Sequence, residues 1–424
     1  MKKKVSFYTF GCRLNQSETA SLQNSFEAGG YTVVDFEQPS DIVVINTCTV
    51  TEGGDADTRR LVNKVNRLHP QARIALVGCQ AQVQKEELAM PNVRWIVGNQ
   101  RKMDLVSVFN EYPDPQTATV VAPTIEREPF TLPVPAIDRQ HTRANIKIQD
   151  GCDFFCSFCE IPYARGRARS RVFDDILVES RALVAAGHKE IILTGINIGT
   201  YAHDGKELLH VIDALEQLEG LERIRISSIE PTTIPGELFD RMGGKLCRYL
   251  HIPLQAGHND VLSEMKRKYT TEEFSAFIRK ARTKVQQICI GTDVIVGFPG
   301  ETDGHFEATA KLLRELTVHY FHVFSYSPRH MAKSRLMDTM PAHVISARSQ
   351  VLRELSARKR RIFHEALLGT IQTVLFEEIK EGVWCGVTDN YVRVKAASSR
   401  NLQNQLVPVR LERVDGQAVW AEII

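Results

Sequence analysis

Strand-like and helix-like segments alternate along the N-terminal part of the chain, and this alternation constrains the fold more than any other feature. The pattern predicts strands over 5–10, 42–46, 74–77 and 95–97, and helices over 18–28, 58–68 and 82–88. Strands joined by helical crossovers form parallel sheets covered by helices. The sequence therefore predicts an N-terminal parallel α/β domain.

A second and longer series of the same kind follows. It predicts strands over 144–149, 190–194, 223–227, 249–252, 291–296 and 321–325, with helices such as 175–186, 274–285 and 306–316 between them. Six strands with helical crossovers suit either a partial TIM-like barrel or an open doubly wound sheet. Periodicity alone does not decide between the two.

The two series are separated by a proline-rich segment, and the chain ends in a different pattern. Residues 113–135 hold six of the seventeen prolines, which predicts an extended linker over 113–137. A basic helix is predicted over 346–368. Five short strands follow, over 373–378, 383–388, 391–395, 407–414 and 418–423, and they predict a small antiparallel β-barrel of a shape often used to bind nucleic acid.

Composition narrows the class of protein. Hydrophobic residues make up 43% of the chain and charged residues 25%, a globular balance. The 53 basic and 51 acidic residues nearly cancel, so any nucleic-acid binding must come from local basic patches. Without an apolar run long enough for a membrane span or a signal peptide, we expect a soluble cytoplasmic protein with no membrane association.

Cysteine placement carries the strongest chemical signal. The chain has nine cysteines, and in a reducing compartment an odd number favours metal binding or catalysis over a disulfide framework. Cys152, Cys156 and Cys159 form a CxxxCxxC segment directly after the first strand of the second series. Three thiolates on a four-iron cluster would leave one iron open to another ligand. Structural zinc, which would need a fourth ligand nearby, and a buried loop of free thiols are the alternatives.

Three further cysteines are far apart in the sequence but share one local context. Cys12, Cys48 and Cys79 each follow a predicted strand and precede a predicted helix. In a parallel sheet all three would lie along the carboxyl edge, where ligands bind. We therefore expect a shared metal site with three ligands, and separate structural thiols are the alternative. The remaining cysteines have no such neighbours and are interpreted as buried apolar residues: Cys247, Cys289 and Cys385.

Four arginines alternate in the segment after the CxxxCxxC loop: Arg165, Arg167, Arg169 and Arg171. In an extended segment they would point to one side and suit phosphates near a reaction centre. A solvated surface ladder is the alternative. The histidines, including His251 and His322, have no metal-ligand spacing and are interpreted as structural.

These motifs resemble those of the radical S-adenosylmethionine (SAM) methylthiotransferases. The resemblance rests on CxxxCxxC, on the GCRLN, NTC and GCQAQ segments around the other three cysteines, and on the C-terminal barrel. It implies a methylthiotransferase domain over 1–112, a linker over 113–137, a radical SAM core over 138–364 and an RNA-binding TRAM domain over 365–424. It also implies that the core is a partial (β/α)6 TIM-like barrel.

The resemblance further implies which residues hold the cofactors. The CxxxCxxC cysteines would bind a 4Fe-4S cluster whose open iron binds SAM, and a second 4Fe-4S cluster on Cys12, Cys48 and Cys79 would deliver sulfur. Cleavage of SAM would give a 5′-deoxyadenosyl radical that abstracts hydrogen from carbon 2 of a modified adenosine. No catalytic residue beyond the cluster ligands is implied. Candidate SAM contacts lie at or near the other strand ends of the core: Gly195, Asn197, Glu230, Gln255 and Asp293. Loop turns or core hydrogen bonds explain these five residues equally well.

Within the family, the segments 46–51 and 148–152 resemble the group that modifies N6-threonylcarbamoyladenosine (t6A) beside the tRNA anticodon. We therefore expect a monomeric enzyme that methylthiolates carbon 2 of t6A in tRNA, giving ms2t6A, with a flavodoxin- or ferredoxin-like electron donor. Related alternatives are N6-isopentenyladenosine in tRNA and an aspartate of a ribosomal protein. The alternative from a different class is a non-catalytic RNA-binding protein with structural zinc.

Overall fold

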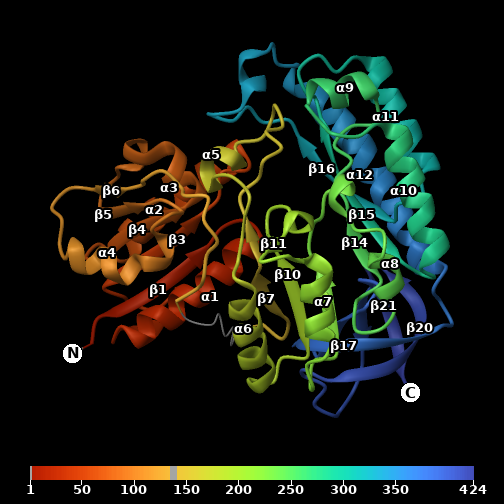
Figure 1. Ribbon diagram of the computed structural model, residues 1–424, viewed down its shortest axis with the longest axis horizontal. Helices are drawn as coiled ribbons and strands as arrows, with labels where there is room; N and C mark the ends of the chain where they lie inside the picture. Colours follow the sequence, from red (N-terminus) through yellow and green to blue (C-terminus); the bar gives the residue numbers. More distant parts are fainter. Residues whose placement is uncertain (1, 134–140) are drawn as a thin grey trace.

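In the computed structural model, which describes residues 2–133 and 141–424, the N-terminal part of the chain forms one six-stranded sheet. The strand order is β2-β1-β3-β4-β5-β6, and every pairing is parallel. Successive residues of the central strands alternate between two apolar clusters, one on each face under the helices (Figure 1). The bounds are β1 Lys4–Thr9, α1 Arg13–Ala28, β2 Thr32–Val34, β3 Ile42–Thr47, α2 Glu52–Leu68, β4 Arg73–Gly78, α3 Cys79–Gln84, β5 Val93–Val97, α4 Leu105–Glu111 and β6 Thr119–Val121, with single 3-10 turns at Lys85–Leu88 and Lys102–Asp104.

The predicted N-terminal parallel α/β fold is confirmed, but sequence reasoning missed both edge strands. β2 and β6 have three residues each and no fully buried position, so their alternation gives little signal. β6 lies inside the predicted 113–137 linker and pairs with β5. We propose that the domain boundary follows Val121 rather than residue 112. Residues 134–137 of the predicted linker and 138–140 of the predicted core lie outside the described residues.

The central part is an open barrel made of two parallel three-stranded sheets, β13-β10-β7 and β14-β15-β16. Parallel bridges from Ile224 to Leu246 and from Ser228 to His251 join the sheets between β13 and β14. The largest apolar cluster of the described residues packs the strands against the outer helices. The expected partial TIM-like barrel is therefore confirmed.

The strands of this barrel are β7 Ala144–Lys147, β10 Glu190–Thr194, β13 Arg223–Ile226, β14 Tyr249–His251, β15 Cys289–Val296 and β16 Tyr320–Ser325. Its longer helices are α6 Phe173–Ala185, α7 Leu208–Glu216, α10 Thr271–Lys284 and α11 Asp303–Glu315. The shorter elements are β8 Gln149–Asp150, α5 Ile161–Arg165, β9 Arg169–Ser170, β11 Ala202–His203, β12 Lys206–Glu207, α8 Leu238–Arg241 and α9 Asn259–Glu264, with 3-10 turns at Ile198–Thr200, Pro231–Thr233 and Lys333–Leu336.

The C-terminal part consists of a long helix and a closed five-stranded barrel. The helix is α12 Ala342–Glu365, and the strands are β17 Ile371–Lys380, β18 Val383–Thr388, β19 Arg393–Ala396, β20 Leu406–Asp415 and β21 Ala418–Ile423. The strand order is β17-β18-β19-β21-β20. The expected small barrel is confirmed, with the difference that β19 and β21 pair in parallel. The strand predicted to start at Tyr391 starts at Arg393, because Tyr391 has a left-handed φ of 64°.

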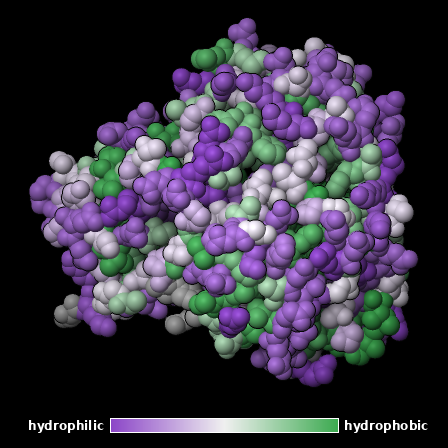
Figure 2. Space-filling view, in the orientation of Figure 1, coloured by the Kyte–Doolittle hydropathy of each residue, from purple (hydrophilic) through white to green (hydrophobic). Residues whose placement is uncertain are grey.

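The N-terminal domain and the C-terminal barrel both pack against the central barrel. Figure 1 shows α1, in red, running beside β7, and the C-terminal barrel, in blue, below β14 and β15. The apolar cluster of the C-terminal barrel continues into the central part through Tyr249, Cys289 and Tyr320. Hydrophilic residues cover most of the face seen in Figure 2, and the apolar side chains on it form small separate groups. In the described part of the chain, no helix combines the length and the apolar character needed to cross a bilayer.

Candidate metal centres and the cavity between the domains

The three N-terminal cysteines lie along one edge of the first sheet. Cys12, Cys48 and Cys79 follow β1, β3 and β4, which are neighbours in the parallel sheet. The chain reaches this arrangement only because residue 11 is glycine: a Cβ on Gly11 would lie 2.9 Å from the sulfur of Cys48. Burial raises the pKa of Cys12, and it raises that of Cys48 to about 12. These thiols ionise at neutral pH when a metal replaces the proton.

The CxxxCxxC loop leaves the central barrel after β8. The backbone N–H of Phe154 lies 3.5 Å from the sulfur of Cys152, and Arg267 donates from Nη1 to the sulfur of Cys156 at 3.1 Å. Burial raises the pKa of Cys152 to about 11 and that of Cys159 to about 12. Hydrogen bonds to the sulfur atoms are one of the means by which proteins tune a bound iron–sulfur cluster.

The sulfur spacing bears on which metal group fits. All nine cysteines are free thiols. Among the described residues, neither triplet has its three sulfur atoms within 4.8 Å of one another. Thiolates on one tetrahedral zinc, at about 2.3 Å from the metal, would stand about 3.8 Å apart. Neither triplet is therefore preformed in this structure as a site for a single tetrahedral zinc ion.

The two cysteine-bearing loops are bonded directly to each other. Thr49, next to Cys48, donates from its hydroxyl to Oε1 of Glu160, next to Cys159, at 2.8 Å. Arg329 donates to the same Thr49 hydroxyl at 2.9 Å and forms an ion pair with Asp55 of α2. Thr49 is 1% exposed and Glu160 is 2% exposed, so these contacts are shielded from water. The fold thus fixes the two candidate centres side by side.

A buried ion-pair network also joins the two domains. Glu18 of α1 accepts from Lys147 of β7 at 2.7 Å and from Arg165 of α5 at 3.0 Å. The side chains of the network are four cations and two carboxylates: Lys102, Lys147, Arg165, Arg169, Glu18 and Asp150. A buried excess of positive charge is costly without a counter-charge. Cys79 lies within electrostatic range of Lys102 and Arg165, so a negatively charged metal–thiolate group fits here.

The phosphate-binding interpretation of the arginine ladder is wrong for its two end members. Arg165 belongs to the buried network, and Arg171 forms ion pairs with Asp175 and Glu179 of α6. Each of these two arginines is 1% exposed. The segment is not one extended strand, because α5 ends at Arg165 and β9 spans only Arg169–Ser170, and so the alternation does not point the side chains one way.

The candidate SAM contacts surround the CxxxCxxC loop in different settings. Glu230 pairs with Arg267, which also contacts Cys156. Asn197 shares a cavity of about 290 Å³ with Cys152, and its buried Nδ2 has no hydrogen-bond partner. Gln255 and Asp293 line a smaller cavity of about 200 Å³. A Cβ on Gly195 would lie 3.0 Å from both Gln149 O and Oε1, so packing already explains that glycine.

A large cavity of about 550 Å³ lies where all three parts of the chain meet. Its wall includes Cys12 from the N-terminal domain, Gly195 and Asp293 from the central barrel, and Tyr391 and Arg393 from the C-terminal barrel. Small-molecule sites are commonly of this size and lie between domains. The cavity is large enough to hold a nucleoside beside Cys12.

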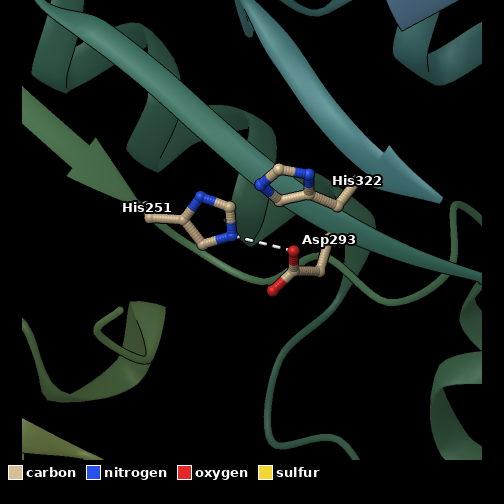
Figure 3. Close-up of side chains that lie close together, drawn as sticks. All are labelled: His251, Asp293 and His322. Carbon is tan, nitrogen blue, oxygen red and sulfur yellow. Dashed lines mark hydrogen bonds and ion pairs between the residues drawn. The ribbon is translucent and has the colours of Figure 1, made fainter. Parts of the chain in front are cut away.

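Sequence reasoning missed a histidine pair in this cavity. His251, Asp293 and His322, from β14, β15 and β16, have ligand atoms within 4.8 Å of one another. Asp293 Oδ1 lies 2.8 Å from His251 Nε2, and Figure 3 shows the ring of His322 beside this bonded pair. Burial, aided by His251 and Arg360, lowers the pKa of His322. Only the strand register, which pairs Asp293 with His322, could have revealed the group.

The three cysteines outside the triplets are only partly as expected. Cys247 and Cys289 are buried, at 1% and 3% exposure. Cys385 is half-buried rather than buried. It lies on β18, where its side chain contacts the backbone oxygen of Val383. The interpretation of Cys385 as a core residue is therefore wrong, since one face of a small barrel is open to solvent.

Comparisons with known proteins agree with this geometry. Two family models match: the radical SAM superfamily over residues 146–313, and a family described as "Uncharacterized protein family UPF0004" over residues 4–98. The chain is 36% identical to the threonylcarbamoyladenosine tRNA methylthiotransferase MtaB of Bacillus subtilis, over 96% of this chain and 93% of that protein. It is 32% identical to a tRNA-2-methylthio-N(6)-dimethylallyladenosine synthase of Cereibacter sphaeroides, over 96% of each.

A solved structure also shares the fold. The radical SAM methyltransferase TsrM from Kitasatospora setae superposes with a TM-score of 0.56, at 16% identity, over 76% of this chain and 73% of that one. At this level of identity the likeness concerns the fold alone.

Proposed function

The chain belongs to the radical SAM methylthiotransferase family, and from that premise we propose that it methylthiolates carbon 2 of t6A next to the anticodon of tRNA. One observation carries the proposal. Two cysteine triplets on different domains are held side by side through Thr49 and Glu160, and Cys12 of one triplet opens into a cavity of nucleoside size. A reaction that joins a sulfur atom to an unactivated carbon needs both centres to reach the same substrate atom.

The residues of each triplet would hold one 4Fe-4S cluster: Cys152, Cys156 and Cys159 in the core, and Cys12, Cys48 and Cys79 in the N-terminal domain. When bound, the core cluster with SAM supplies radical chemistry for the C–H bond, and the second cluster supplies sulfur. The chain itself orients these groups. Arg267 donates to the sulfur of Cys156, and the excess cations near Cys79 offset negative charge.

The SAM-binding residues that we propose are the core cysteines with Gly195, Asn197, Glu230, Gln255 and Asp293. Asn197 has the best support, because its buried Nδ2 has no partner in a cavity that it shares with Cys152. Glu230 would act through Arg267, which it holds against Cys156. We further propose that the C-terminal barrel binds the tRNA, that a flavodoxin- or ferredoxin-like protein supplies electrons, and that the enzyme is a cytoplasmic monomer.

The choice of t6A over the isopentenylated base rests on two observations. Four relatives named threonylcarbamoyladenosine tRNA methylthiotransferase are 32–37% identical to the chain, and relatives named for the dimethylallyl base are 30–32% identical. The large cavity is polar and lined by arginines, which suits a charged substituent better than an apolar one. A zinc protein without catalysis is disfavoured by the match to the radical SAM superfamily over residues 146–313.

The test is a paired measurement on the anaerobically reconstituted enzyme. Cys48→Ala should still cleave SAM to 5′-deoxyadenosine through the intact CxxxCxxC loop, but should form no methylthiolated nucleoside. Cys156→Ala should lose SAM cleavage and retain the iron of the N-terminal triplet. Cys385→Ala, a half-buried cysteine outside both triplets, is the matched control and should behave as wild type. Methylthiolated t6A at near wild-type yield from the Cys48 variant would refute the sulfur site.

A further inference from the structure

The end of the large cavity next to the C-terminal barrel is cationic. Arg13 at the start of α1, Arg143 before β7 and Arg393 of β19 all line it. Arg143 already pairs with Glu377, at 2.6 Å from Nε to Oε1. In the described part of the chain, Arg13 and Arg393 have no carboxylate within ion-pair distance. These two guanidinium groups thus have no ion-pair partner of their own among the described residues, although Glu377 and Asp293 also line the cavity.

Tyr391 lies among these arginines. Its ring stacks on Tyr249 with the centroids 4.3 Å apart, and its hydroxyl accepts from Arg13 Nη2 at 3.0 Å. Burial alone would raise the pKa of Tyr391, but Arg13, Arg143, Arg225 and Arg393 outweigh burial and leave that pKa below its usual 10.0. An oxygen at this end of the cavity therefore experiences a positive potential contributed by all three parts of the chain.

The wall of the same cavity also holds polar atoms that lack partners. Asn145 Oδ1 and Ser227 Oγ are both buried without a hydrogen bond, and both residues line the cavity. Asn145 is 7% exposed. Buried polar atoms are almost always satisfied in native proteins, so such atoms in a cavity wall indicate a ligand that satisfies them. Asn145 Oδ1 is an acceptor, and the matching group on a ligand is an N–H.

We propose that this end of the cavity is a carboxylate subsite, in which Arg393 and Arg13 bind the carboxylate of the threonylcarbamoyl group and Asn145 accepts a hydrogen bond from a carbamoyl N–H. The inference rests on the proposed function and adds the chemistry that selects the substrate. Guanidinium groups bind carboxylates through paired, charge-assisted hydrogen bonds. A neutral isopentenyl group would form none of these charge-assisted bonds and would leave the buried Oδ1 of Asn145 without a partner, so the site would discriminate against it.

The test measures binding as well as turnover. The probes are two anticodon stem-loop RNAs, one carrying t6A and one in which the threonine carboxylate is replaced by a carboxamide. Dissociation constants are measured by fluorescence anisotropy with the reconstituted enzyme at one stated salt concentration. The wild type should bind the t6A stem-loop about 10- to 100-fold more tightly than the carboxamide stem-loop, the range expected for charge-assisted hydrogen bonds. Arg393→Gln should reduce this preference to about 2-fold or less.

The control is Arg410→Gln, which removes an exposed arginine of the same barrel that does not line the cavity. It should leave the preference for the carboxylate unchanged. If Arg393→Gln weakens the binding of both RNAs equally, Arg393 contacts only the phosphate backbone, and the carboxylate subsite is refuted. That result leaves the proposed function intact, whereas wild-type enzyme that forms no methylthiolated t6A from t6A-containing tRNA would overturn the proposed function itself.

Discussion

Glu18→Gln should be among the most destabilising single changes in this protein. Glu18 is 1% exposed and accepts from Lys102, Lys147 and Arg165. Removing one partner of a buried ion pair costs about 3–5 kcal/mol, because the remaining charge stays buried and unpaired. Glutamine keeps the shape but not the charge, and here it leaves several cations against Asp150 alone. We therefore expect a loss in the upper part of that range.

The assay is thermal unfolding followed by fluorescence, with the enzyme in the same cluster state throughout. For a unit the size of residues 4–121, a loss of about 3–5 kcal/mol corresponds to a fall of roughly 10–20 °C in the first unfolding midpoint. Glu111→Gln is the matched control, because the Arg101–Glu111 pair has side chains 30% and 45% exposed. Exposed pairs contribute below about 1 kcal/mol. A shift of less than 3 °C for Glu18→Gln would refute the reasoning.

Acidification and a second substitution test the same network. Burial opposes ionisation of Glu18, but Arg165, Lys102 and Lys147 outweigh burial and hold its pKa well below the usual 4.5. Its contribution is therefore complete at neutral pH and is lost as the pH falls below about 4.5 toward the folded-state pKa. The double variant Glu18→Gln/Lys102→Met should unfold at a higher temperature than Glu18→Gln alone, because it removes one of the uncompensated cations.

Two further predictions concern other parts of the fold. In Gly11→Ala, a Cβ would lie 2.9 Å from the Cys48 sulfur. This variant should therefore contain the iron and acid-labile sulfide of one cluster and should still cleave SAM. Two clusters per chain in Gly11→Ala would contradict this prediction. Burial lowers the pKa of His319 to about 3, so the folded state keeps this imidazole neutral. The contribution of His319 to the free energy of unfolding should therefore fall by up to about 1.4 kcal/mol for each pH unit below pH 6.5. Urea unfolding measured at pH 7 and at pH 5 should show a smaller decrease in the free energy of unfolding for His319→Gln than for the wild type.

Much of the architecture follows from local sequence, because strand and helix patterns are set by alternation of apolar residues along a few turns of chain. The central strands of both βα series and the five strands of the C-terminal barrel are examples. The short edge strands β2 and β6 were not predicted, because three residues without a fully buried position leave no such alternation. The two cysteine triplets were visible because each cysteine directly follows a strand or lies in a tight spacing.

Tertiary structure alone decided which charges meet. Arg165 and Arg171 share a regular spacing with Arg167 and Arg169, yet the two end members are buried in ion pairs and Arg167 is 57% exposed in its side chain. The partners of Arg165 are Glu18, far away in the sequence, and Asp150. No local pattern encodes such pairs, because an ion pair depends on distance in space and burial, and both are set by how the domains dock.

The cavity between the three parts of the chain shows this division most clearly. The sequence by itself determined that two groups of cysteines stand at the carboxyl ends of parallel strands, since that follows from the order of residues along the chain. That Arg13, Arg143 and Arg393 surround one end of a shared cavity, and that His251, Asp293 and His322 converge in it, was decided only when three separately patterned parts packed together. Strand patterns arise from neighbours a few residues apart, whereas the cavity is built from residues whose separation in sequence exceeds any local period.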